Sequence, residues 1–178
     1  MGSKGPQPGA LAWMGVTQDN DTLYDVLLIK SPLLLVGWLI LAIAPRWRYS
    51  QHIAQAIGLI FAVLYVLLMV DGFMNPIDIS AQTKGKYKNV FELFYSLEGV
   101  HYLFANKAAC FGGWVHYCVF DLWAGAWIAR DSVERGFPQL ILIPCLFFTM
   151  MLGPSGLLLY FILRSAWELV AGKKQKTV

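Results

Sequence analysis

Four long apolar runs divide this chain of 178 residues, and they limit the folds that it can adopt. The runs cover about residues 23–44, 53–70, 108–128 and 140–163. A helix needs roughly 17–25 predominantly apolar residues to cross the hydrocarbon core of a bilayer, and each run falls within that range. The pattern therefore predicts an all-α integral membrane protein with four transmembrane helices.

The composition agrees with a membrane protein. Apolar residues make up 57% of the chain and charged residues 14%, whereas soluble domains average about 45–50% and about 25%. A chain of this length has room for one domain. We expect a short N-terminal segment (1–22), one four-helix transmembrane domain (23–170) and a basic C-terminal tail (171–178). The net charge of +3 is too small to indicate a nucleic-acid partner.

Lysine and arginine residues predict which way the spans face. Four spans would place both termini and the loop between spans two and three on one side of the membrane. That side would hold nine of the basic residues in the flanks, against four on the other side. Because basic flanking residues favour the cytoplasmic side, we expect both termini to face the cytoplasm or the stroma.

The loop between the second and third spans contains a further helical signal. Asn89 followed by Glu92 fits a helix start of the capping-box kind, and apolar and aromatic residues then recur at helical spacing. With three lysines just upstream, the stretch 89–104 predicts a short amphipathic helix in the membrane interface. Glu98 and His101 lie three residues apart. They either meet on one face or are ordinary surface residues, and the sequence leaves both interpretations open.

His116 and Asp121 lie inside the third apolar run, near three tryptophans. A charge at the centre of a bilayer costs at least roughly 2.5–3.5 kcal/mol, so chains that carry ionisable groups there usually use them. On an α-helix Tyr117 and Asp121 share a face, whereas His116 lies about 140° from Asp121 and cannot touch it. Each therefore needs a partner from another segment or from a ligand. A catalytic role and a structural hydrogen-bonding role both stay open.

The fourth run has an irregularity at Gly153 and Pro154. Pro154 lacks the amide that would bond the carbonyl of Met150, so a kink is expected there. Such kinks either pack helices together or line cavities at mid-membrane. The three cysteines show no spacing typical of zinc ligands, and no metal site is expected.

Four sequence blocks carry a resemblance to a known family. They are SPLLLVGWLILAIAPRWRYSQ at 31–51, FYSLEGVHYLF at 94–104, GGWVHYCVFDLWAGAWIARD at 112–131 and LIPCLFFTMMLGPSGLLLYFILR at 142–164. In this order they resemble the neoxanthin-synthase-like membrane proteins, a family named from abscisic-acid-deficient plants. The Trp-x-His-Tyr-x-x-Phe-Asp-Leu and Gly-Pro-x-Gly-x-x-x-Tyr patterns are the most specific parts, and the resemblance covers most of the chain.

The resemblance implies a four-helix membrane protein of xanthophyll metabolism, which converts an epoxy-carotenoid such as violaxanthin to an allenic product such as neoxanthin. This isomerisation changes no oxidation level, so it requires no redox cofactor or metal, and acid–base groups in a dry apolar pocket suffice. The family blocks make His116 and Asp121 the main catalytic candidates. Further candidates are Tyr117, Glu98, His101 and Asp131 as helpers, and Trp114, Trp123, Gly153 and Pro154 as substrate contacts.

Whether the chain is an enzyme stays open, with catalysis favoured. The alternative is a non-catalytic subunit or assembly factor of a larger complex, such as a photosystem or light-harvesting assembly, in which His116 ligates a chlorophyll. Both interpretations predict a lipid bilayer and an apolar polyene or pigment as partners, within a homo-oligomer or a larger membrane complex. The resemblance favours a plastid membrane, thylakoid or envelope, and a bacterial membrane is also compatible.

Overall fold

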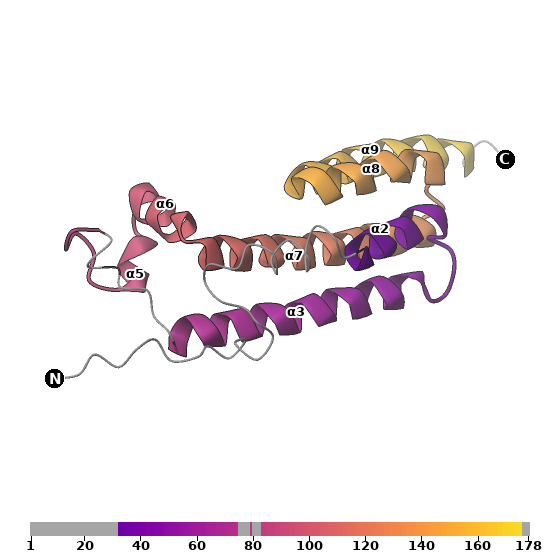
Figure 1. Ribbon diagram of the computed structural model, residues 1–178. Coiled ribbons are helices and arrows are strands. Elements are labelled where there is room, and N and C mark those ends of the chain that lie inside the picture. The colour runs from indigo at the N-terminus through magenta and orange to yellow at the C-terminus, as the bar shows by residue number, and fades with distance from the viewer. Residues whose placement is uncertain (1–31, 75–78, 80–82, 176–178) are drawn as a thin grey trace. The chain divides into compact units, whose positions relative to one another are not determined.

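The structure is a computed structural model that describes residues 32–74, 79 and 83–175. Every regular element in these ranges is a helix (Figure 1). The helices are α2 (Leu33–Ile43), α3 (Ser50–Met74), α5 (Val90–Leu93), α6 (Leu97–Ala105), α7 (Lys107–Glu134), α8 (Gln139–Leu152) and α9 (Pro154–Gln175). The predicted all-α fold is confirmed for this part of the chain. The predicted N-terminal segment and the start of the first span lie outside the described residues.

One described helix, α3, is long and apolar enough to cross a membrane. Its 25 residues include a window of mean hydropathy 2.6, and most of that window is exposed. The apolar helices α2 and α8 have only 11 and 14 residues. With 28 residues α7 is long enough, but its glycine, tryptophan, histidine and aspartate residues lower its mean hydropathy. Four transmembrane crossings therefore stay a prediction.

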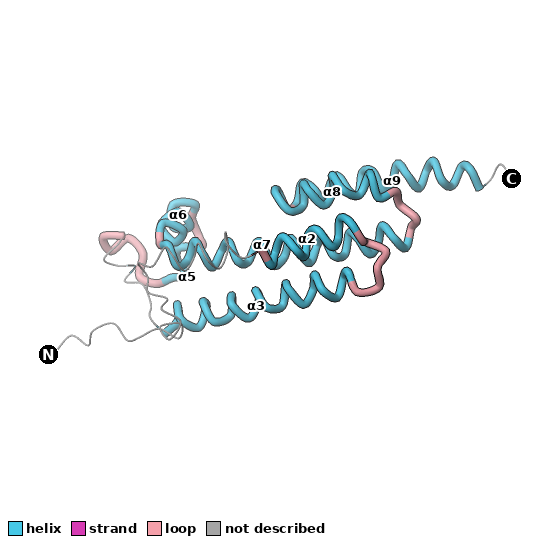
Figure 2. Tube along the Cα trace, turned by 45° about the vertical axis from the view of Figure 1, so that its right-hand side comes forward, coloured by secondary structure: helices cyan, strands magenta, loops and turns pink. Residues whose placement is uncertain are grey.

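The fourth predicted span, 140–163, is not one helix. Instead α8 ends at Leu152, α9 begins at Pro154, and the two helices pack side by side (Figures 1 and 2). Gly153 reverses the chain with φ 47° and ψ −98°, a conformation that residues with a Cβ rarely adopt. Pro154 is well suited to start α9, because the first turn of a helix leaves its amides unbonded. The expected kink is thus a complete reversal.

The predicted interfacial helix at 89–104 is two helices, because the sequence contains two N-caps. The Asn89 side chain accepts a hydrogen bond from Glu92 N at 3.1 Å, as the capping-box signal predicted. Ser96 has an extended backbone, and its hydroxyl accepts a second capping bond from Gly99 N at 3.0 Å. The chain therefore leaves α5 after Leu93 and starts again as α6.

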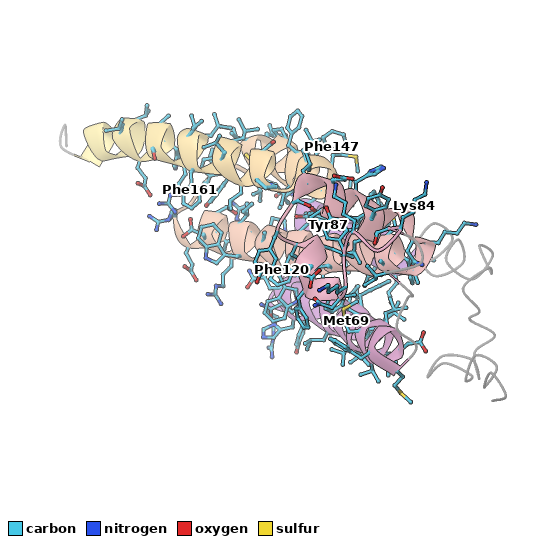
Figure 3. All side chains as sticks on the ribbon, turned by 90° about the vertical axis from the view of Figure 1, so that its left-hand side faces the viewer. Met69, Lys84, Tyr87, Phe120, Phe147 and Phe161 are labelled. Atoms are coloured by element: carbon cyan, nitrogen blue, oxygen red, sulfur yellow. The ribbon has the colours of Figure 1, made fainter. Side chains whose placement is uncertain are left out.

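The described residues form two compact units, and each is considered separately. Unit 1 contains the described part of residues 62–116, and unit 2 contains residues 32–61 and 117–175. In unit 1 a small core of Ile79, Tyr87 and Leu93 is covered by three partly buried residues of α5 and α6, and Figure 3 labels Tyr87. The Tyr87 hydroxyl shares a hydrogen bond of 2.7 Å with the hydroxyl of the α6 cap.

Close helix packing in unit 2 depends on glycine. Gly125 of α7 faces the Trp38 indole of α2, and a Cβ at Gly125 would overlap that ring. A Cβ at Gly37 would lie 3.2 Å from Leu122, which is fully buried. Small residues let helix backbones approach in this way, and the bulky partners fill the space. The core of unit 2 therefore lies where α2, α7, α8 and α9 meet, around Leu41, Leu122, Leu146 and Tyr160.

The tightest of these contacts holds the reversal together. Gly156 of α9 lies against the backbone of Thr149 of α8, and a Cβ there would collide with the Thr149 amide. We expect Gly156→Ala to destabilise the protein by about 1–3 kcal/mol, because the obstructing atoms belong to backbone and cannot move aside. Thermal unfolding in detergent, followed by circular dichroism, measures this.

Gly72→Ala is the matched control for that experiment, because a Cβ at Gly72 of α3 meets nothing within 4 Å. It should not lower stability, since alanine favours helix over glycine by roughly 1 kcal/mol. Equal stability of the Gly156 variant and the wild type would contradict the close α8–α9 contact.

Candidate functional site

Asp121 and Gly153 are the two predicted site residues that the structure brings together in unit 2. Asp121 lies on α7, and Gly153 is the residue at which the chain turns from α8 into α9. A Cβ at Gly153 would lie 2.7 Å from Asp121 Oδ1, so any larger residue would collide with the carboxyl group. Glycine at this position therefore meets two needs, the positive φ of the turn and the approach of Asp121.

The Asp121 carboxyl is half-buried, and no described residue donates a hydrogen bond to it or forms an ion pair with it. It lies beside the start of α9, where the partial positive charge of a helix N-terminus favours an anion. Its neighbours along α7, Phe120 and Leu122, are apolar. A carboxyl group with free oxygens in such surroundings is able to exchange a proton with a bound molecule.

Asp131 lies ten residues further along α7 and is held quite differently. Its Oδ2 accepts a hydrogen bond of 2.7 Å from the Tyr160 hydroxyl and one of 3.1 Å from Arg164 Nη1. Arg135 Nε donates to both carboxylate oxygens at 2.9 Å, and Arg135 Nη1 donates to Glu168 at 2.5 Å. This five-residue charged cluster joins the C-terminal end of α7 to α9.

The surroundings of Asp131 determine its charge. Burial favours the neutral carboxyl, but hydrogen bonds from Tyr160, Arg135 and Arg164 outweigh burial and hold the pKa of Asp131 below its usual value. Both of its oxygens are occupied, and its side chain is only 12% exposed. Asp131 therefore stabilises the fold as an anion, in contrast to the unbonded carboxyl of Asp121.

Four of the predicted site residues lie in unit 1. The His116 ring lies 5.4 Å from the Tyr65 ring on α3, and Trp114 is 60% exposed. Glu98 bonds Lys86 at 2.5 Å, and this hydrogen bond raises the pKa of the Lys86 ammonium. The predicted meeting of Glu98 with His101 is not found, since His101 instead lies beside the ring of its neighbour Tyr102.

The remaining predicted site residues lie in unit 2. Tyr117 is 61% exposed. Trp123 is partly exposed and lies against Gly58 of α3, where a Cβ would be 2.5 Å from the indole Nε1. Pro154 is exposed at the start of α9. The catalytic and substrate-binding roles of all these residues stay predictions.

Sequence reasoning gave Asp131 only a helper's role and missed its partners. The signals were two pairs with helical spacing, Asp131 with Arg135 and Arg164 with Glu168, each four residues apart. Such pairs share a helix face. Their meeting could not be read from the sequence, because it depends on the reversal at Gly153.

Among the described residues, no three His, Cys, Asp or Glu side chains gather closely enough to hold a metal ion. The model of the protein family described as ABA DEFICIENT 4-like matches residues 26–160. That range contains α2 to α8 and the first turns of α9. No curated protein and no solved structure matches the chain.

The charged cluster generates a prediction about stability. Because Asp131 is ionised in the folded state with a lowered pKa, its contribution is present above the unfolded value of about 3.9 and is lost as pH falls through the folded value. We expect Asp131→Asn to cost about 2–3 kcal/mol near neutral pH. The gap to the wild type should narrow below about pH 4, as thermal unfolding over a pH series would show.

Glu134→Gln serves as the control, because Glu134 forms only an exposed ion pair of 3.7 Å with Arg130. Its effect should stay within about 0.5 kcal/mol. A stability gap for the Asp131 variant that does not change with pH would show that the carboxylate charge is not what stabilises the cluster.

Proposed function

Because the chain belongs to the ABA DEFICIENT 4-like family, we propose that it is a multi-pass membrane protein of xanthophyll metabolism. Its proposed reaction is the epoxide-opening isomerisation of an epoxy-carotenoid, such as violaxanthin, to an allenic product such as neoxanthin. The observation that carries this proposal is the family match, which extends over residues 26–160. The family's link with abscisic-acid deficiency favours a plastid membrane as its location.

The exposed apolar surface of the helices supports a membrane environment. Leu59, Ile60, Val63 and Val66 of α3 are each more than half exposed. Large apolar side chains are also exposed along α7, α8 and α9. A soluble monomer rarely exposes contiguous apolar patches of more than a few hundred Å², whereas the lipid phase of a bilayer accepts such a surface and dissolves the proposed substrate.

The proposed reaction moves protons and no net electrons. The epoxide oxygen gains a proton as one of its carbon–oxygen bonds breaks, and the neighbouring vinylic carbon loses a proton. The electron pair of the broken carbon–hydrogen bond becomes the second double bond of the allene. The protein must therefore supply one acid and one base within reach of the substrate, in a site without water.

Asp121 is the carboxyl group best suited to this work. Its oxygens have no hydrogen-bond donor among the described residues, whereas those of Asp131 are occupied by Tyr160, Arg135 and Arg164. A carboxylate held by three donors is a poor base, because proton uptake would break those bonds. His116 is the second proton-transfer group that the sequence proposes.

The activity prediction concerns Asp121→Asn. Asparagine keeps the shape of the side chain and removes its proton exchange, so conversion should fall by about 10²–10⁴-fold. The measurement is chromatography of carotenoids from purified protein in detergent incubated with violaxanthin. Retained thermal stability of the variant separates lost chemistry from lost folding.

Glu134→Gln, which changes a carboxyl group outside the proposed site, is the control and should convert violaxanthin at the wild-type rate. Full activity of the Asp121 variant would refute the assignment of Asp121. A wild-type protein that leaves every epoxy-xanthophyll unchanged, in detergent and in cells that make violaxanthin, would refute the reaction itself.

A second candidate function rests on the exposure of His116. This imidazole lies on the exposed side of α7 in unit 1, where a pigment of a larger membrane complex would have access to it. The function would then be that of a pigment-binding subunit or assembly factor. Chlorophyll that copurifies with the wild type and is lost from His116→Ala, together with unchanged xanthophylls, would favour this candidate over the isomerase.

A further inference from the structure

The α8–α9 pair has the length of an element that enters a membrane from one side and leaves it on the same side. We propose that α8 and the first half of α9 form a re-entrant hairpin seated among the acyl chains of one leaflet. The C-terminal tail then lies on the same side as the turn after α7. The inference rests on the proposal that the protein resides in a membrane.

Two contacts along α7 give the depth of the hairpin. Its tip, Gly153, lies against Asp121, and its base is fixed where Arg164 meets Asp131 at 3.1 Å. Asp121 and Asp131 are ten residues apart on one continuous helix, which is about 15 Å at a rise of about 1.5 Å per residue. The hydrocarbon core is about 30 Å thick, so the hairpin reaches about half-way across.

The same contacts do not fit residues 140–163 crossing a membrane as one straight helix. If 140–163 crossed as one helix antiparallel to α7, its C-terminal end would lie near the N-terminal end of α7. Instead Tyr160 and Arg164 bond Asp131 near the C-terminal end of α7. Phe137, in the turn before α8, packs against both Tyr160 and Trp167 of α9 at ring distances of 5.5 and 6.3 Å. Both ends of the hairpin therefore lie beside the C-terminal end of α7.

The charged and the exposed apolar side chains lie at opposite ends of the hairpin. The charged end suits the lipid headgroups, and the apolar end suits the acyl chains. The base of the hairpin carries the charged cluster and Trp167, which are the groups expected at a membrane interface. Towards its tip the surface is apolar, and Figure 3 labels Phe147 in this region. The exposed side chains near the tip are Phe147, Phe148, Met151, Leu152 and Leu158. This distribution fits one leaflet, with the interface at the base of the hairpin.

The turn between α2 and α3 belongs to the same side. The Gln139 amide at the start of α8 donates to the carbonyls of Ala42 and Ile43, both at 2.9 Å. Arg46 Nη1 in turn donates to Gln139 Oε1 at 3.4 Å. The base of the hairpin, the turn after α2 and the C-terminal tail therefore share one face of the membrane.

This arrangement reverses the orientation expected from four crossings. If the apolar runs at about 23–44, 53–70 and 108–128 each cross once, the sequence divides its flanking basic residues into eight on the face of the hairpin base and five on the other face. The eight are Arg46, Arg48, Arg130, Arg135, Arg164, Lys173, Lys174 and Lys176, and the five are Lys4, Lys84, Lys86, Lys88 and Lys107. Because the richer face is cytoplasmic or its equivalent, this count of crossings predicts a cytoplasmic C-terminal tail and a loop at 83–106 on the opposite side.

The test compares three positions in a chain whose native cysteines are replaced by alanine. Single cysteines are introduced as Arg48→Cys, Lys88→Cys and Lys174→Cys, and sealed vesicles of one orientation are treated with a membrane-impermeant maleimide. The hairpin predicts that positions 48 and 174 react or are protected together, with position 88 opposite to them. Four crossings would group position 174 with position 88, and that result would overturn the hairpin.

Controls separate the hairpin from the proposal on which it rests. All three cysteines should react after detergent is added, and a C-terminal peptide tag digested by protease gives the same information without any substitution in α9. Protein released from vesicles by alkaline carbonate would refute membrane residence and the hairpin with it. Protein retained in the membrane, with position 174 on the side of position 88, would refute the hairpin alone.

Discussion

The ion pair between Asp131 and Arg164 is the interaction on which the arrangement of unit 2 depends. It joins two helices at residues that are 33 positions apart, and both of its side chains are mostly buried. Arg135 also bonds Asp131, and Arg164 also lies 3.7 Å from Glu168, so the pair is one part of a connected network of charges. The pair fixes where α9 lies along the length of α7. It therefore also fixes which residue of α7 lies beside Gly153.

With that level fixed, small residues determine how closely the helices approach. Gly156 allows α9 to lie against the backbone of α8, and Gly153 allows the turn to meet Asp121. The aromatic side chains of Trp127 and Phe137 then pack around Tyr160, whose hydroxyl bonds Asp131. Apolar packing and the buried charge therefore support one another. Within the described part of unit 2, the Asp121 carboxyl receives no hydrogen bond, which is why the chemical proposal centres on it.

Local sequence signals predicted the local structure well. The apolar run at 53–70 gave a continuous helix, and Asn89 with Glu92 gave an N-cap at the expected residue. The capping signal of Ser96, however, was hidden inside a pattern with helical spacing. Hydropathy also failed at 140–163, because it reports where apolar residues lie and not whether the chain continues straight. Gly153 followed by Pro154 was the evidence for a break, and only the contacts with Asp121 and Asp131 show that the chain turns back.

The contact of Gly156 with Thr149 has a consequence for how the chain is made. Helix α8 is too short to remain across a bilayer by itself, and its polar Thr149 is fully buried only when α9 covers it. In the proposed hairpin the two helices would therefore enter the lipid as a pair. A chain that ended between Gly153 and Arg164 would leave Thr149 and the backbone beside it without the helix that covers them.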